Sequence, residues 1–431
     1  MGGVIQMNES APVPAPRRRL VSTTSVISAH KVAQIAGSLA AVVILPRLLG
    51  VEDYGRFSFV LSLTFLGAIL ADLGTLDVFG RFVPTMTPDA ARKLYMRTLA
   101  FSLAVSLLCF VATAAASMLL ASWMVPLWAL LAGTMVVLRV ASWVPFQYAL
   151  AQNRVGAWMT EQAWRQWVTL GALVVLYPLL GFTGALLALV LMEALFAGLG
   201  LWWARGDWLG RELRVEWRYF KPFLLAGVGF FLANLAAVAL YRSGPVLVEA
   251  LTGNSAQVGY LSLAIGMYLM VYVTVSQFAQ SLIPALTTLR AQGRIDEMQR
   301  RLGSFMRVWL LVTIPATVAV WLLAGWAAPL VFGQDFAAAA PALRWISLAM
   351  APAVIVWAAN VTATVSGRGA IKFSAILVAL LIFLAGTVAL APGYGAAGAA
   401  LALSVAVLVQ AVLLSVRLRP EFRLSVIWRR S

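Results

Sequence analysis

The sequence predicts an all-α integral membrane protein with about twelve transmembrane helices in two parallel six-helix halves. Apolar residues make up 62% of the 431 residues and charged residues only 11%, whereas a soluble domain carries about 25% charged residues. Apolar runs of roughly 20 residues recur between short polar segments, as expected of elements that cross ~30 Å of hydrocarbon. Because a spanning segment must satisfy its own backbone hydrogen bonds, and alternating ten-residue strands are missing from the pattern, the spans are helices.

The apolar runs fall into two sets of six, one in each half of the chain. The first half covers residues 20–204 and the second half covers residues 222–417. Between them, residues 205–221 place Leu209 and Trp217 on the apolar side of a helix predicted to lie on the membrane surface. The twelve predicted spans lie near residues 20–46, 57–84, 97–120, 127–150, 162–178, 184–204, 222–242, 258–283, 306–325, 341–362, 372–391 and 396–417.

The formal net charge of +16 is unevenly distributed along the chain. About 25 of the 32 Lys and Arg residues lie in the tail 1–19, which is predicted to be disordered, in every second loop, and in the tail 418–431. Because cytoplasmic loops carry an excess of Lys and Arg, both termini are predicted to be cytoplasmic in a bacterial inner membrane. We expect these basic clusters to contact anionic membrane lipids and not nucleic acid.

Two segments of the chain repeat each other at a fixed distance. The glycines, alanines and proline of PLLGFTGALLA (178–188) recur 214 positions later in PGYGAAGAALA (392–402). At the same offset, Arg154 in QNRVGAW corresponds to Arg368 in SGRGAIK. A common offset for several features predicts two related halves, and transporters built this way bind their substrate between the halves, near the middle of the bilayer.

Two longer segments resemble a known family. LPRLLGVEDYGRFSFVLSLTFLGAILADLG (45–74) resembles the opening of bacterial polysaccharide flippases in the multidrug/oligosaccharidyl-lipid/polysaccharide (MOP) exporter superfamily, the group that includes O-antigen-type oligosaccharide flippases. YRSGPVLVEALTGNSAQVGYLSLA (241–264) is similar to the seventh helix and outer turn of that family. In one respect the sequence departs from the family, because Tyr241 stands where members commonly place an acidic residue before the arginine.

The resemblance implies two six-helix bundles around a central cavity. Such a protein moves oligosaccharides linked to undecaprenyl diphosphate from the inner to the outer leaflet by alternating access, for cell-surface or exopolysaccharide synthesis. The lipid-linked oligosaccharide is then the main partner. A glycan polymerase or export machinery, and H⁺ or Na⁺ as a coupling ion, are further partners that the resemblance allows.

Polar residues inside the first predicted span are the first candidates for the translocation path. A charge at bilayer depth costs at least ~2.5 kcal/mol, so it usually faces a cavity or a partner. Lys31 lies near the middle of the span and Gln34 follows one turn later, on a polar stripe with Thr24, Ser28 and Ser38. The stripe is either a cavity wall that offers hydrogen bonds to sugar and diphosphate or a helix-packing face rich in small polar residues.

Three charged residues lie in the second predicted span. Asp77 and Arg81 are spaced i, i+4 and can pair, whereas Asp72 lies deeper and apart from them. One interpretation is a structural ion pair. The other places Arg81 at the inner gate or against the diphosphate.

Three further charges complete the candidate set. Arg139 lies near the centre of helix 4 and Glu193 near the centre of helix 6, so they either neutralise each other or act separately, Arg139 on the diphosphate and Glu193 on a coupling ion. Arg242 lies near the outer end of helix 7. Because guanidinium forks suit phosphate oxygens, we expect Lys31, Arg81, Arg139 and Arg242 to line the headgroup path together with Gln34 and Asp72, and Asp77 or Glu193 to couple an ion.

The composition argues against an enzyme. His30 is the only histidine and Cys109 the only cysteine, and the sequence shows neither a phosphate-binding loop nor a nucleophile motif, so we predict that it has no catalytic residues, metal or cofactor. A cation-coupled multidrug exporter of the same superfamily is the main alternative, since Asp72, Asp77 and Glu193 permit coupling to H⁺ or Na⁺. A non-transporting scaffold for glycan enzymes is a third possibility.

Overall fold

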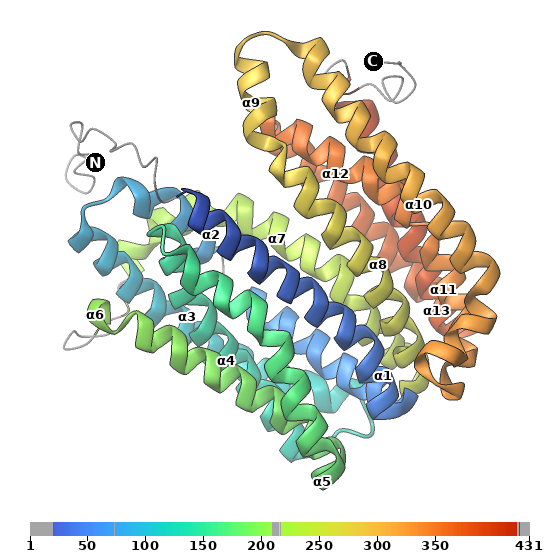
Figure 1. The fold of residues 1–431 in the computed structure, drawn as a ribbon. Helices are drawn as coiled ribbons and strands as arrows, with labels where there is room; N and C mark the ends of the chain where they lie inside the picture. Colours follow the sequence, from blue (N-terminus) through green and yellow to red (C-terminus); the bar gives the residue numbers. More distant parts are fainter. Residues whose placement is uncertain (1–19, 73, 209–214, 216, 420–421, 423–431) are drawn as a thin grey trace. The chain divides into compact units, whose positions relative to one another are not determined.

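The computed structural model describes residues 20–72, 74–208, 215, 217–419 and 422. These residues form helices and connecting turns, without a β-strand among them, as the sequence predicts (Figure 1). The elements before residue 209 are α1 (Leu20–Asp72), α2 (Thr75–Phe82), η1 (Val83–Thr85), α3 (Pro88–Leu120), α4 (Pro126–Ala151), α5 (Val155–Trp203) and α6 (Arg205–Trp208). Those after residue 216 are α7 (Trp217–Thr252), α8 (Ser255–Ser281), α9 (Ile283–Ala291), α10 (Ile295–Phe332), η2 (Gln334–Ala339), α11 (Ala340–Ser347), α12 (Met350–Val365) and α13 (Gly369–Arg417).

Three of the long helices are interrupted by a glycine with non-helical backbone. In α1 it is Gly50 (φ 71°, ψ 173°), in α5 Gly181 (φ 58°, ψ −143°) and in α13 Gly395 (φ 54°, ψ −132°). A positive φ combined with such a ψ is adopted almost exclusively by glycine, so the chain can turn sharply there. After the break in α5 the two arms approach so closely that a Cβ on Gly184 would lie 2.0 Å from the carbonyl oxygen of Leu176.

The breaks give the sequence repeat a structural meaning. Gly181 and Gly395 are 214 positions apart, have nearly the same φ and ψ, and lie inside the repeated segments 178–188 and 392–402. Each repeat is therefore a tight turn between two helical arms. The agreement supports two halves built on one plan.

The described part of the chain contains nine helices that are long and apolar enough to cross a membrane. Three of the nine are the helices broken at a glycine. Twelve crossings, with each arm of a broken helix counted separately, stay a prediction. Residues 209–214 and 216 of the surface helix predicted for 205–221 lie outside the described residues. The described part of this segment contains α6 and the start of α7.

The chain divides into two compact units. The described residues of unit 1 are 20–45 and 60–235, and those of unit 2 are 46–59 and 236–422. In unit 1, α4 packs against α3 and α5, and in unit 2 α13 packs against α8, α11 and α12 (Figure 1). The predicted boundaries of the halves, at 204 and 222, stay a prediction; the units place residues 46–59 with the later part of the chain.

Residues 46–59 are fixed to the rest of unit 2 by close backbone contact. A Cβ on Gly55 would lie 1.8 Å from the carbonyl oxygen of Ser255, and one on Gly259 would lie 2.4 Å from that of Val51. Since both glycines are needed for this approach, GVEDYG and the start of α8 form one packed contact. This accounts physically for two glycines in the segments that carry the family resemblance.

Two side chains hold residues 46–59 to other elements of unit 2, α10 and η2. The Arg47 guanidinium donates to the carbonyl oxygens of Leu330 and Val331, each at 2.6 Å, at the C-terminal end of α10. These carbonyls lack helical partners, and a cation is favourable beside them. The ring of Tyr54 packs edge-on against Phe336, with centroids 6.0 Å apart.

Candidate functional site

Four charged residues of unit 1 form one cluster, which we call the charge network: Arg139, Glu161, Arg165 and Glu193. Arg139 lies in the middle of α4, Glu161 and Arg165 lie one turn apart in the first arm of α5, and Glu193 lies in its second arm. The break at Gly181 folds the two arms of α5 back on each other. It thereby brings Glu193 to the level of Arg165, 28 positions earlier in the chain.

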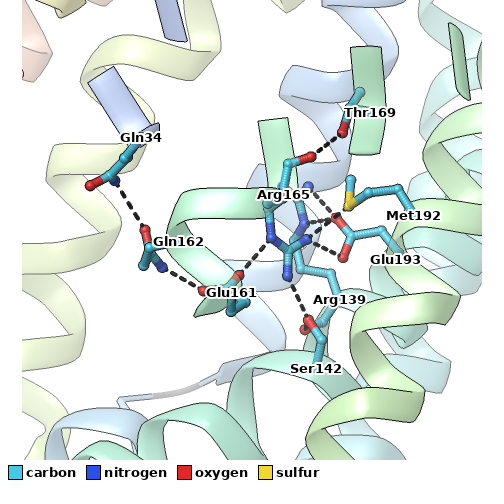
Figure 2. Close-up of polar contacts among 9 residues, drawn as sticks. All are labelled: Gln34, Arg139, Ser142, Glu161, Gln162, Arg165, Thr169, Met192 and Glu193. Carbon is cyan, nitrogen blue, oxygen red and sulfur yellow. Dashed lines mark hydrogen bonds and ion pairs between the residues drawn. The ribbon is translucent and has the colours of Figure 1, made fainter. Parts of the chain in front are cut away.

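Glu193 is held by two guanidinium groups at once (Figure 2). Arg139 donates to its Oε1 from Nε at 2.6 Å and also from Nη2. Arg165 donates to its Oε2 from Nη1 at 2.6 Å and to Glu161 Oε1 from Nε at 2.6 Å. Each carboxylate oxygen of Glu193 therefore has an arginine partner.

The network is buried and electrically neutral. Arg139, Glu161 and Glu193 are between 1% and 3% exposed, and the Arg165 side chain is 15% exposed. Taking an ion out of water costs several kcal/mol, and attraction repays this only when the geometry is good and the remaining donors and acceptors are satisfied. Two cations and two anions in mutual contact meet most of that requirement.

Aromatic rings cover the guanidinium groups. The Arg139 guanidinium lies 3.8 Å from the centroid of the Phe65 ring, and that of Arg165 lies 5.0 Å from Phe196. Such cation–π contacts gain strength when water is excluded. Nη1 of Arg139 is buried without a hydrogen-bond partner among the described residues, so the network retains one unused donor.

Polar contacts extend the network to α1. The Gln162 amide donates to Glu161 Oε2 at 2.6 Å, and Gln34 donates to Gln162 Oε1 at 3.4 Å. On the other side, Arg165 Nη2 donates to the Ser142 hydroxyl at 3.1 Å. Figure 2 shows this continuous row of polar side chains from α1 through both arms of α5 to α4.

The structure brings three of the eight predicted site residues into this row. Arg139 and Glu193 adopt the first of the two predicted arrangements, mutual neutralisation, and Gln34 joins them through Gln162. The side chains of Lys31 and Asp77 lie outside the described residues, so the predicted Asp77–Arg81 pair is not tested.

The other three predicted residues lie elsewhere. Asp72 is buried at the end of α1, and Arg242 is partly buried in α7 of unit 2. Arg81 is exposed at the end of α2, with its guanidinium 5.4 Å from the Phe82 ring. The roles predicted for these residues stay predictions.

Sequence reasoning missed Glu161 and Arg165. The predicted span 162–178 starts after Glu161 and only three residues before Arg165, so both residues fall at its edge, where charged residues are expected. The helix begins earlier, at Val155. The available signal was the i, i+4 spacing of Glu161 and Arg165, which indicates a pair on one helix face.

Comparisons with known proteins agree with this architecture. A model of the polysaccharide biosynthesis protein family matches residues 20–290. Among the solved structures, a lipid II flippase, MurJ, in an inward closed conformation is similar with a TM-score of 0.78 and 13% identity, over 94% of this chain and 89% of that chain. No curated protein matches the sequence.

Transporters of a second kind share the fold. An inward-facing multidrug resistance MATE transporter of the MOP superfamily has a TM-score of 0.66 and 13% identity, over 91% of this chain and 95% of that chain. An outward-facing MATE transporter has a TM-score of 0.54 and 14% identity, over 94% and 97%. The chain therefore shares its fold with a lipid II flippase and with MATE transporters of the MOP superfamily. With its family match covering more than half of its length, the chain belongs to the family of polysaccharide biosynthesis proteins.

Proposed function

We propose that this protein is a flippase that moves oligosaccharide linked to undecaprenyl diphosphate from the inner to the outer leaflet of a bacterial inner membrane. The family match over residues 20–290 carries the proposal. The transported oligosaccharide would be used to make cell-surface polysaccharides such as exopolysaccharide, O-antigen or lipopolysaccharide. Alternating access is the proposed mechanism, with the lipid tail remaining in the bilayer.

The charge network suits recognition of a diphosphate headgroup. Arg139 and Arg165 converge on the two oxygens of one carboxylate, Glu193. Guanidinium forks that bind a carboxylate also bind phosphate oxygens. In the proposed cycle a phosphate group takes the place of Glu193 between the two arginines, while Arg81, Arg242, Lys31, Asp72 and Gln34 line the rest of the path.

A cation-coupled multidrug exporter is the alternative function, supported by the fold shared with MATE transporters. Coupling would use Asp72, Asp77 or Glu193. In the described structure Glu193 has two arginine partners, so a coupling cation would have to displace one of them. This arrangement favours an anionic headgroup over an organic cation as the ligand of the network.

The decisive experiment compares the two leaflets. The gene is deleted in its host, and a sugar-reactive probe that cannot cross the membrane reports lipid-linked oligosaccharide on the outer face. We expect the intermediate to accumulate on the inner face, wild type to restore outer labelling, and Arg139→Lys at equal abundance to reduce it by at least tenfold, because lysine keeps the charge but loses the bidentate fork.

A matched control is available on the surface of α10. Arg301 is 50% exposed and pairs with Glu297 one turn away, an arrangement that contributes little to stability, so Arg301→Gln should restore outer labelling fully. Normal labelling in the deletion strain, combined with cation efflux from vesicles that contain the protein, would contradict the flippase and support the exporter.

A further inference from the structure

A cavity of about 210 Å³ lies in unit 1, where α4 ends and α5 begins, away from the charge network. Its wall includes three apolar residues, Pro145, Phe146 and Trp203, and three polar ones, Gln152, Arg154 and Asp207. The 26 residues of α4 span roughly 39 Å at 1.5 Å per residue. This exceeds the ~30 Å of bilayer hydrocarbon, so the end of α4 reaches the level of the lipid headgroups.

Two arginines share the Asp207 carboxylate at this cavity. Asp207 is 5% exposed; it accepts a hydrogen bond from Arg92 Nε at 3.0 Å and lies 3.9 Å from Arg154 Nη1. Arg154 is 58% exposed, so its guanidinium can accept another partner. Arg92 also pairs with Asp89 at 3.3 Å, whereas the contact of Arg154 with Asp207 is longer, so Arg154 is the cation at this cavity that a single negative charge on a ligand would meet.

The cavity also contains an unused hydrogen-bond acceptor. Oε1 of Gln152 is buried and has no hydrogen-bond partner among the described residues. A buried acceptor without a donor costs about 1–3 kcal/mol. A phosphodiester supplies no donor of its own, so a ligand that satisfied both Arg154 and Gln152 would carry a hydroxyl group beside the phosphate.

We propose that this cavity binds the headgroup of a hydroxyl-bearing, singly anionic glycerophospholipid, with the chemistry of phosphatidylglycerol. The phosphate contacts Arg154, a headgroup hydroxyl donates to Gln152, and the lipid backbone packs against Phe146 and Trp203. The volume is below the ~300–1,000 Å³ of most small-molecule pockets, which suits a headgroup and excludes an oligosaccharide. A diphosphate would bring more negative charge than Arg154, the arginine in the cavity lining, can neutralise.

The second half of the chain provides a matched control. Asn153 (φ 60°) and Gly367 (φ 69°) form equivalent turns after α4 and α12. In each turn the next residue is arginine, and its backbone N–H donates to the carbonyl five residues earlier, Arg154 to Ala149 at 2.9 Å and Arg368 to Ala363 at 2.8 Å. Arg368 does not line the cavity of unit 1.

The test is lipid retention by the full-length protein. Wild type and variants are purified from membranes that contain equal amounts of phosphatidylglycerol and phosphatidylcholine, and retained lipid is counted by native mass spectrometry. We expect wild type to retain phosphatidylglycerol and Arg154→Gln to retain about tenfold less. Ala157→Leu, which narrows the cavity from its α5 wall, should lower retention likewise, and Arg368→Gln should match wild type.

Three results would overturn the proposal. One is equal loss in the Arg154→Gln and Arg368→Gln variants, which would indicate general attraction to a basic surface. Another is full retention in both Arg154→Gln and Ala157→Leu. The third is displacement of phosphatidylglycerol from wild type by an equal amount of added undecaprenyl diphosphate, which would assign the cavity to the carrier lipid. Because retention is measured without transport, the outcome is independent of the proposed function.

Discussion

Replacing Glu193 by alanine should lower the free energy of unfolding by about 3–5 kcal/mol. The substitution leaves Arg139 buried with no carboxylate partner, and it leaves Arg165 with Glu161 alone. The cost arises from the uncompensated charge more than from the lost contact, since a buried cation without a partner has given up its hydration. The midpoint of thermal unfolding in a mild detergent, followed by helical circular dichroism, measures the effect.

A double variant provides the control for this prediction. Arg139→Met with Glu193→Leu removes one cation and one anion, so the network stays neutral and Arg165 keeps Glu161. Replacing a buried ion pair by apolar residues of similar volume is often neutral or stabilising. We therefore expect the double variant to unfold near the wild-type midpoint. Wild-type stability of Glu193→Ala alone would show that the pair is not buried in the membrane-embedded protein.

The same double variant separates structure from transport. It is expected to fold, yet it lacks one of the two arginines that the proposed function assigns to the headgroup. Outer-face labelling reduced at least tenfold in this folded variant would support a phosphate contact for Arg139. Full labelling would reduce Arg139 and Glu193 to a structural pair, and the headgroup contact would then have to be sought at Arg81, Arg242 or Lys31.

The helical membrane architecture can be predicted from the sequence because this architecture depends on local properties of the chain. Hydropathy sets where helices lie, and the 214-position repeat located the turns at Gly181 and Gly395 because a sharp turn needs glycine at the same place in each copy. Arg139 and Glu193 were recognisable one by one, since charges are rare in apolar runs. Their partner Arg165 was not, because its contact with Glu193 depends on the fold-back of α5, and the sequence shows only its spacing of four residues from Glu161.

The position of residues 46–59 shows a second limit of sequence reasoning. The linear order of spans suggests that everything before residue 205 belongs to one half. The contact of Gly55 with Ser255 joins residues 200 positions apart. The periodicity of neither segment indicates this contact. The two glycines were visible as part of a family resemblance, but their physical role required the structure.

Replacing Gly55 by alanine should destabilise the protein by about 1–3 kcal/mol, and Gly55→Leu by more. The new Cβ would lie 1.8 Å from the Ser255 carbonyl oxygen and 2.9 Å from the Gly259 backbone nitrogen. These are backbone atoms at the start of α8, so a side-chain rotation cannot relieve the clash. The segment 46–59 must therefore move away from α8, which weakens the contacts of Tyr54 and Arg47 as well. Unfolding midpoints in detergent give the size of the effect.

Two further variants decide whether the close approach is the cause. Gly156→Ala places a methyl group in open space within the first turn of α5, and since alanine favours helix over glycine, it should be neutral or stabilising by up to about 1 kcal/mol. Gly259→Ala enters the same contact from the other side, 2.4 Å from the Val51 carbonyl oxygen. Once either alanine has separated the two backbones, the other costs little, so the Gly55→Ala/Gly259→Ala double variant should lose clearly less stability than the two single losses added together. Strict additivity would mean that the two glycines act independently and that residues 46–59 are not held to α8 by a shared contact.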